Sequence, residues 1–123
     1  MDAPAIVELV AAAKSASAIV LSSPVYKATY SGALKVLVDL LPPDALVGKT
    51  ALGIATTKLA AHGVDVSRSY AALFGFFRAQ AHETLVLLDE DLKADGASFA
   101  ASATAGGRIR ETAQSIVKAL AAG

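Results

Sequence analysis

Short apolar runs alternate with longer stretches of helical periodicity along this chain, and this alternation is its strongest constraint on fold. Continuous apolar runs of this length are typical of strands buried on both faces of a parallel sheet. Three runs predict strands, at 18–22, 49–56 and 83–88. Recurrence of apolar side chains every three or four residues predicts amphipathic helices, at 4–16, 31–41, 66–78 and 107–121. Residues 93–104 have neither pattern and are expected to form a loop or irregular link.

The resulting order of elements predicts an α/β fold with three layers. Strands that alternate with helices form parallel sheets through right-handed crossovers, with helices on both faces. A length of 123 residues suits one such domain, so residues 1–123 are interpreted as a single domain. A helix is the first predicted element, and the first 20 residues contain no glycine- or serine-rich loop of the kind that cradles a phosphate in doubly wound domains.

Composition argues against several classes of function. Eleven Lys and Arg residues balance eleven Asp and Glu residues, so the chain has no basic footprint for nucleic acid or for an anionic membrane. The absence of Cys excludes disulfides, thiolate catalysis and Cys-ligated metals, and two His residues are too few for a His-rich metal site. Since no apolar run reaches the roughly 20 residues of a bilayer span and the N-terminus lacks a basic signal region, a cytoplasmic location is expected.

Two polar segments follow predicted strands, at the place where open parallel sheets bind their ligands. Residues 22–35 read Ser-Ser-Pro-Val-Tyr-Lys-Ala-Thr-Tyr-Ser-Gly-Ala-Leu-Lys, and residues 55–63 read Ala-Thr-Thr-Lys-Leu-Ala-Ala-His-Gly. In the first segment, backbone N–H groups, the aromatic face of Tyr26 and the positive end of the helix near Ser31 suit a flat, electron-poor heterocycle.

Plainer interpretations of the same residues stay open. Tyr26 would serve as a loop anchor, Lys27 as a solvated side chain and His62 as part of a loop or helix cap. The serines lack a nearby His–carboxylate pair, so a nucleophilic triad is not expected. The acidic run 89–91 is interpreted as a solvated strand exit, and 106–108 (Gly-Gly-Arg) is a weak candidate for a phosphate loop because no strand precedes it. No catalytic side chain and no metal site is predicted.

The segment from Ser23 to Lys35 resembles, almost residue for residue, a signature of the NAD(P)H-dependent FMN reductases, which have a flavodoxin-like fold. The similarity continues through Leu-Val-Asp-Leu-Leu-Pro at 37–42 and Ala-Leu-Val-Gly-Lys at 45–49 to His62, and it weakens towards residue 81. Within that family the chain is most similar to the FMN reductases of two-component alkanesulfonate-utilisation systems. The remaining residues match only in their pattern of elements.

This resemblance implies FMN and NADPH or NADH as cofactors, and hydride transfer from NAD(P)H to FMN that supplies reduced flavin or reduces a small acceptor. It implies that Pro24, Val25 and Tyr26 lie beside the isoalloxazine ring, with Lys27 and Ser31 at the rim. The full cofactor-binding set that it suggests is Ser23, Pro24, Val25, Tyr26, Lys27, Ser31, Thr56, Thr57, Lys58 and His62. It also implies a homo-oligomer, with a flavin-dependent monooxygenase as a further partner.

Two departures from the family pattern bear on these expectations. Thr57-Lys58-Leu59 stands where the family has Gly-Gly-Thr, so side chains at 57 and 58 are expected to crowd a ring that glycines would admit. The family's first strand, its Gly-Ser-Pro-Arg-Ser-type phosphate loop and its second strand have no counterpart in the sequence. The sheet is therefore expected to be flavodoxin-like but truncated, with strands 3-4-5 of the order 2-1-3-4-5.

The missing strands would leave 18–22 at the edge of the sheet. An exposed Ile-Val-Leu edge is a template for pairing with another chain. Without donors for the phosphate, FMN affinity would fall by a factor on the order of a thousand. The alternative function is therefore a truncated, non-catalytic module that pairs through this edge strand.

Overall fold

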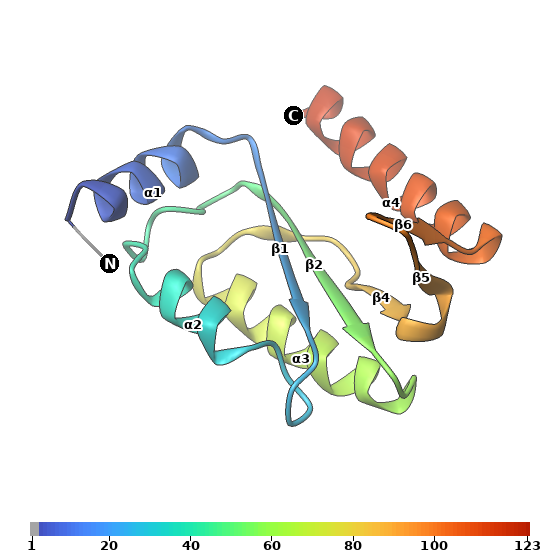
Figure 1. Cartoon of the computed structure of the whole chain (residues 1–123). Helices are drawn as coiled ribbons and strands as arrows, with labels where there is room; N and C mark the ends of the chain where they lie inside the picture. Colours follow the sequence, from blue (N-terminus) through green and yellow to red (C-terminus); the bar gives the residue numbers. More distant parts are fainter. Residues whose placement is uncertain (1–2) are drawn as a thin grey trace.

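A computed structural model describes residues 3–123 and shows alternating helices and strands (Figure 1). The helices are α1 (Ala3–Ser15), α2 (Gly32–Asp39), α3 (Ala61–Phe76) and α4 (Ala103–Ala122), with a short 3-10 helix, η1 (Asp89–Asp91). The strands are β1 (Ala18–Pro24), β2 (Thr50–Thr57), β3 (Gln80–Ala81), β4 (Leu85–Leu88), β5 (Leu92–Asp95) and β6 (Ser98–Ala101). The predicted α/β class is confirmed.

Strand β2 is the centre of a parallel sheet. β1 lies along one side of it, in a register that runs from Ala18 opposite Thr50 to Pro24 opposite Thr56. On the other side, β3 pairs with the start of β2 and β4 pairs with its end, so the two short strands share one position in the sheet. The three strand positions follow the chain order, as expected for adjacent right-handed crossovers.

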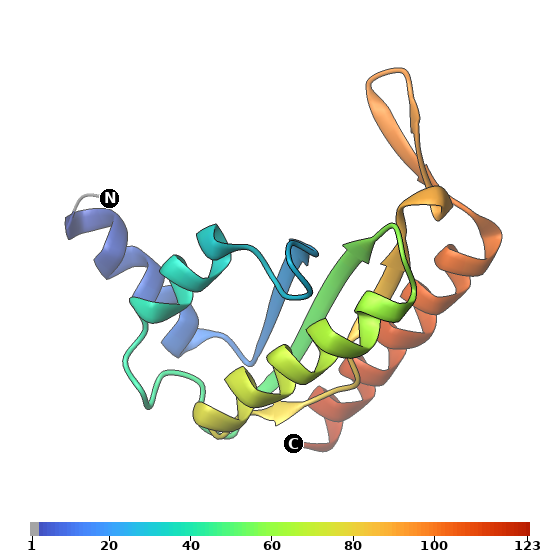
Figure 2. The ribbon, with the colours of Figure 1, turned by 90° about the horizontal axis from the view of Figure 1, so that it is seen from below.

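Helices cover the two faces of this sheet unequally (Figure 2). Helices α2 and α3 pack on one face, around a core that contains Leu21, Val38, Ala55, Val66 and Phe74. Helix α4 packs on the other face, where Ala105 and Ile116 meet Leu52, Leu85 and Leu87. Within residues 3–123, none of the helices combines the length and the apolar character that a bilayer span requires.

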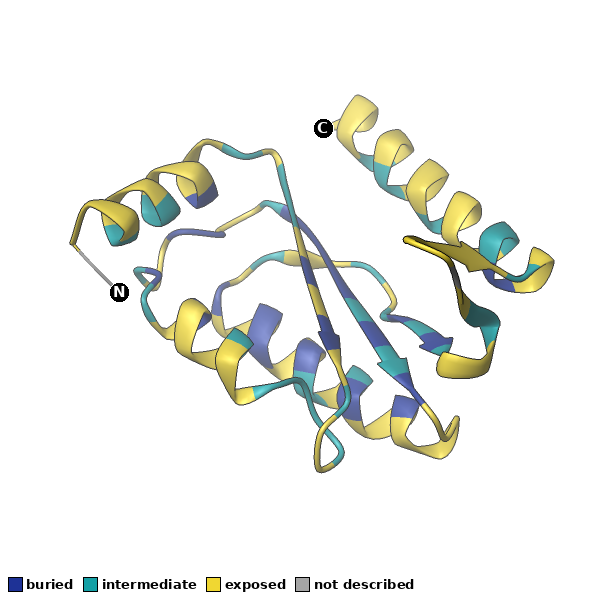
Figure 3. Ribbon diagram, viewed as in Figure 1, coloured by how far each residue is buried: buried dark blue, intermediate teal, exposed yellow. Residues whose placement is uncertain are grey.

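Strand β1 is buried on one face only, which corrects the expectation of burial on both faces. Leu21 and Ser23 face the α2–α3 layer and are buried, whereas Val20, Ser22 and Pro24 are exposed (Figure 3). The physical reason is that the second-face core, built by α4, draws on β2 and β4 and includes no residue of β1. Among the described strands β1 pairs with β2 alone, so its predicted position at the edge is confirmed.

The structure corrects three further expectations. Residues 93–104 are not an irregular link, because β5 and β6 form an antiparallel hairpin and α4 begins at Ala103. Helix α3 begins at Ala61 rather than near residue 66. Its N-cap residue, Ala60, makes no side-chain hydrogen bond, so the sequence has no capping residue that marks this start. Gly106 and Gly107 lie inside α4, so they do not form a phosphate loop.

Tyr70 of α3 is the largest fully buried side chain and lies directly on the central strand. Its hydroxyl donates to the backbone oxygen of Ile54 at 3.0 Å, and its ring stacks with Phe74 at a centroid distance of 5.8 Å. A Cβ at Gly53 would approach the ring to 2.5 Å, so only glycine lets the helix lie this close to β2. Burial raises the pKa of Tyr70 to about 12.

Candidate functional site

The carboxyl ends of β1 and β2 carry the two segments that sequence analysis singled out. Beyond β1 the chain makes a tight turn, in which Tyr26 and Thr29 exchange backbone hydrogen bonds of 2.8 and 3.1 Å. The central residues of this turn, Lys27 and Ala28, have φ values of 51° and 70°. Positive φ at both positions is the signature of a type I′ turn, whose twist suits a tight two-residue hairpin.

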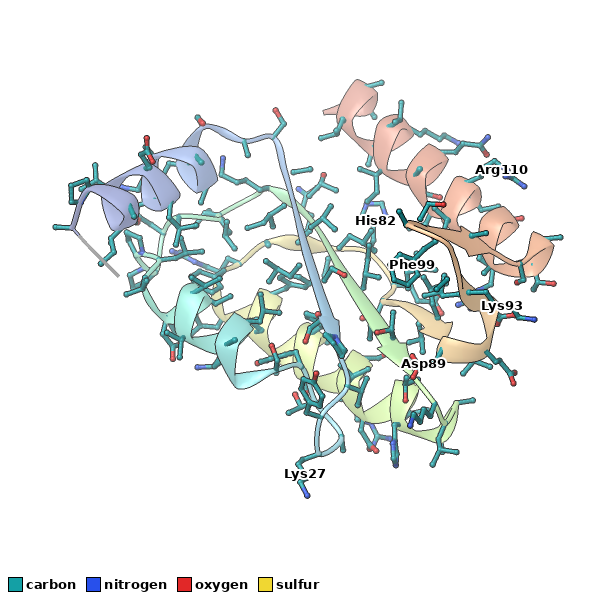
Figure 4. All side chains as sticks on the ribbon, viewed as in Figure 1. Lys27, His82, Asp89, Lys93, Phe99 and Arg110 are labelled. Atoms are coloured by element: carbon teal, nitrogen blue, oxygen red, sulfur yellow. The ribbon has the colours of Figure 1, made fainter. Side chains whose placement is uncertain are left out.

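This turn presents apolar and aromatic groups to solvent. Pro24 is exposed, Val25 is half-buried, and Tyr26 is 59% exposed. Lys27 extends from the tip of the turn, away from the sheet (Figure 4). Tyr26 is therefore not a buried anchor of its loop, and its ring face is available to a ligand.

Ser23 and Ser31 hold the two ends of the β1–α2 segment together. The backbone N–H of Ser31 donates to Ser23 Oγ at 2.8 Å, and Ser23 Oγ donates to the carbonyl of Pro24 at 2.8 Å. Ser31 in turn caps α2, since its Oγ accepts from the N–H of Leu34 at 3.1 Å. Both hydroxyls are engaged in shaping the segment, and Ser23 is only 4% exposed.

The β2–α3 segment lies against the first through Thr56. The carbonyl of Thr56 accepts a 2.9 Å hydrogen bond from the N–H of Val25, and Thr56 stands opposite Pro24 in the strand register. Its side chain is half-buried. The two segments are thus joined through their backbones at the carboxyl edge of the sheet, while the Val25 side chain packs against the α2–α3 core.

Thr57 is turned away from solvent. It is 5% exposed, and its Oγ1 both donates to the carbonyl of Leu59 at 3.2 Å and accepts from the N–H of Leu59 at 3.3 Å. Lys58 and Leu59 are exposed at the tip of the segment, and His62 is exposed in the first turn of α3. Of the two side chains expected to crowd a ring, Lys58 is the one on the surface.

Eight of the predicted residues lie at the surface of the two adjacent segments β1–α2 and β2–α3. Those that lie exposed or half-buried at the carboxyl edge are Pro24, Val25, Tyr26, Lys27, Ser31, Thr56, Lys58 and His62. Ser23 and Thr57 are buried beneath them and hold the segments in shape. Whether these residues contact a cofactor stays a prediction.

A third group at this edge was not predicted. The hairpin β5–β6 rises beyond the carboxyl ends of the strands (Figure 2), and a recess of about 280 Å³ there is lined by Thr56, Asp89, Leu92 and Phe99. In the sequence, the acidic run 89–91 is the feature closest to this hairpin. Its last residue, Asp91, accepts a hydrogen bond from the hydroxyl of Ser102 at 2.9 Å, which closes the hairpin at its base. Sequence reasoning had interpreted that run as solvated.

Larger hollows lie elsewhere on the molecule. One of about 700 Å³ runs between α2 and α3 and includes Tyr30 and Phe76, and one of about 620 Å³ runs beside α3 and β4. Both are open grooves beside helices. All three hollows border the predicted segments: the two grooves through Tyr30 and Ala60, and the smaller recess through Thr56. The smaller recess is the one that the β5–β6 hairpin also lines, through Leu92 and Phe99.

Comparison with known proteins agrees with the sequence resemblance. The family model described as NADPH-dependent FMN reductase matches residues 1–92. The chain is 40% identical over 79 residues to an FMN reductase (NADPH) of Escherichia coli strain K12, covering 64% of this chain and 41% of that protein. It is 40% identical over 84 residues to an FMN reductase (NADPH) of Pseudomonas putida, covering 68% and 42%. The chain therefore spans about two fifths of the length of these relatives.

Solved structures share the fold. An oxidoreductase from Corynebacterium diphtheriae superposes with a TM-score of 0.82 and 26% identity, over 100% of this chain and 65% of that one. The apo form of an NADH:FMN oxidoreductase superposes with a TM-score of 0.68 and 28% identity, over 72% and 48%. The parallel sheet, the loop signature and the match over residues 1–92 lead to one conclusion: the chain belongs to the NADPH-dependent FMN reductase family.

Proposed function

We propose that the chain acts in NAD(P)H-dependent reduction of FMN, by seating the isoalloxazine ring at the carboxyl edge of β1 and β2. The observation that carries this proposal is the shape of the β1–α2 segment. It offers exposed Pro24 and Tyr26, with Pro24 opposite Thr56 in the strand register, and buried Ser23 ties the two ends of the segment together through the N–H of Ser31. A flavin bound there would supply an acceptor for the hydride, that is two electrons and one proton, of a reduced nicotinamide.

The residues at this edge fit the ring portion of a flavin. Within residues 3–123 the N–H groups of Lys27 and Ala28 donate to no other group, so they are free to meet ring carbonyls. The face of Tyr26 suits contact with a flat ring system. Hydride transfer needs close placement of two rings rather than a side-chain acid or base. The task of these residues is to bind and orient.

The same residues do not fit the phosphate of FMN. Doubly wound folds hold a phosphate on a glycine-rich turn at a helix N-terminus. At the carboxyl edge α2 is capped by the side chain of Ser31, and α3 follows Ala60 with no glycine turn between β2 and the helix. We therefore infer that this chain recognises the ring and not the phosphate.

A flavin titration tests the proposal. Quenching of flavin fluorescence on addition of the protein should give dissociation constants for FMN and riboflavin that agree within about threefold, since the phosphate finds no partner. NADH and NADPH oxidation should then rise when FMN is added. A chain that quenches neither flavin would contradict the proposal, and FMN binding a thousandfold tighter than riboflavin would contradict its restriction to the ring.

The edge of β1 supports a second candidate, an interaction module. A groove of about 300 Å³ runs beside this strand and is lined by apolar side chains of α1, β1 and α2, among them Leu9, Ile19, Leu34 and Leu37. Strand edges with an unpaired backbone accept another strand. A homo-oligomer built through β1 would satisfy both the edge and the groove, with or without flavin.

Light scattering tests assembly through β1, and the flavin titration tests the first candidate independently. A Val20→Lys variant places a charge on the exposed face of β1 and should convert an oligomer to a monomer, whereas Val36→Lys on the exposed face of α2 should not. An oligomer that survives Val20→Lys contradicts assembly through β1. A flavin-dependent monooxygenase as partner, the alkanesulfonate subgroup and a cytoplasmic location stay predictions from the sequence.

A further inference from the structure

The hairpin β5–β6 has one apolar face that leads from the core into solvent. Its register sets Leu92 opposite Ala101 and Ala94 opposite Phe99, so these four side chains share one face. At the base, Leu92 packs against the core cluster beneath α4. Farther out, Phe99 is 81% exposed, the highest value among the exposed large hydrophobic residues of the described chain.

The base of the hairpin is clamped, so this apolar face has a defined direction. Ser102 donates from its N–H to the carbonyl of Asp91 at 2.8 Å and from its Oγ to Asp91 Oδ1 at 2.9 Å. The same Oγ accepts from the N–H of Ala105 at 3.1 Å and caps α4. An isolated two-stranded hairpin is marginal in water, and here the clamp ties it to a helix that packs on the sheet.

The apolar face borders the recess at the carboxyl edge. Thr56, Asp89, Leu92 and Phe99 line this recess, and Phe99 lies on the side of the hairpin towards β2 and β4 (Figure 4). Thr56 is the residue whose carbonyl binds Val25 in the predicted ring-binding segment. At about 280 Å³ the recess is just below the usual range of pockets for small molecules, roughly 300–1,000 Å³, which suits one part of a cofactor.

We propose that the β5–β6 hairpin is a second wall of the flavin-ring site and that Phe99 packs against the bound ring. This inference rests on the proposed function. It assigns the exposed apolar face of the hairpin to a flat aromatic occupant, held between Phe99 on one side and Thr56 on the other, next to Pro24 in the strand register. A second copy of the chain is the competing occupant, but Thr56 in the recess wall and the position at the carboxyl edge favour the ring.

Flavin binding by matched phenylalanine variants tests the inference. Phe99→Ala should weaken riboflavin and FMN binding by about tenfold in fluorescence titrations, in the range found for loss of one stacked aromatic. Phe99→Tyr should restore binding to within about twofold, because the ring is kept. Phe76→Ala removes another exposed phenylalanine, 65% exposed, at the end of α3 that meets the amino edge of the sheet, and should leave both constants unchanged.

A second readout does not depend on the variants. Resonances of the Phe99 ring in the wild-type chain should shift on addition of riboflavin, and those of Phe76 should not. Equal flavin affinity in wild type and Phe99→Ala, or an unmoved Phe99 resonance at saturation, overturns the inference while the proposed function stands. A wild-type chain that binds no flavin overturns both. If the Phe99 resonances shift only when light scattering shows a dimer, the hairpin face binds a second copy of the chain. That result overturns the inference.

Discussion

The N–H of Ser31 donates a hydrogen bond to Ser23 Oγ at 2.8 Å across eight residues of chain. This contact joins the last residues of β1 to the cap of α2 and closes the segment that contains Tyr26. The Ser23 hydroxyl also donates to the Pro24 carbonyl at 2.8 Å, so one buried oxygen satisfies two backbone groups. The exposure of Tyr26 therefore depends on a side chain that is itself hidden.

Ser23→Ala should destabilise the chain by about 1–2 kcal/mol, because the Ser31 N–H and the Pro24 carbonyl lose their partner. Urea unfolding followed by circular dichroism measures the loss, and a flavin titration should show weaker binding as the segment loosens. Ser22→Ala changes the exposed neighbour on the opposite face of β1 and should cost less than about 0.5 kcal/mol. Equal stability of the two variants would show that the contact does not hold the segment.

The turn at Lys27 and Ala28 should become more stable when its residues suit its backbone. Both have positive φ, which costs a non-glycine residue roughly 1 kcal/mol, and Asn-Gly is the preferred pair for a type I′ turn. The double variant Lys27→Asn, Ala28→Gly should raise the free energy of unfolding by about 1 kcal/mol. Ala28→Pro demands φ near −65° and should lower it. An Asn-Gly variant no more stable than wild type would argue against this turn.

Sequence reasoning found the elements whose own residues carry their signal. The apolar run 18–22 and the helical periodicity of 31–41 are local, and the structure has β1 and α2 there. The two carboxyl-edge segments followed from the strand order alone. The hairpin was missed because alanine fills three positions of β5 and β6 and hides their alternation, and because its clamp joins Asp91 to Ser102 across the hairpin.

Burial of β1 on one face was missed for a related reason. Whether the second face of a strand is covered depends on where a distant helix lies, and the described core beneath α4 includes residues of β2 and β4 but none of β1. The roles of Ser23 and Thr57 were likewise hidden, since a serine or threonine at a strand end reads equally as a ligand group or as a backbone partner. The need for glycine at position 53 was not visible in the sequence either, because it comes from the close approach of Tyr70, which lies far along the chain.

Gly53→Ala should destabilise the chain by about 2–3 kcal/mol through overpacking. The new Cβ would approach the Tyr70 ring to 2.5 Å, and the ring cannot retreat because Phe74 and Tyr30 pack around it and its hydroxyl binds Ile54. Gly75→Ala, with nothing within 4 Å of the added carbon, should be neutral or stabilising by up to about 1 kcal/mol. Thermal unfolding compares the two variants. Similar melting temperatures would mean that α3 shifts freely over β2.

Tyr70 should make the chain sensitive to alkali. Its pKa is raised by burial to about 12, whereas in the unfolded chain it is about 10. The contribution of protonated Tyr70 to the free energy of unfolding is present in full below pH 10. It is lost between pH 10 and 12, because in this range only the unfolded chain releases the proton. The loss is on the order of 2 kcal/mol. Tyr70→Phe cannot titrate, so although it gives up the bond to Ile54 and starts less stable, its unfolding free energy should fall less steeply over this window. Urea unfolding at pH 9, 10 and 11 measures the slopes for both proteins. Parallel slopes would contradict a protonated, buried Tyr70.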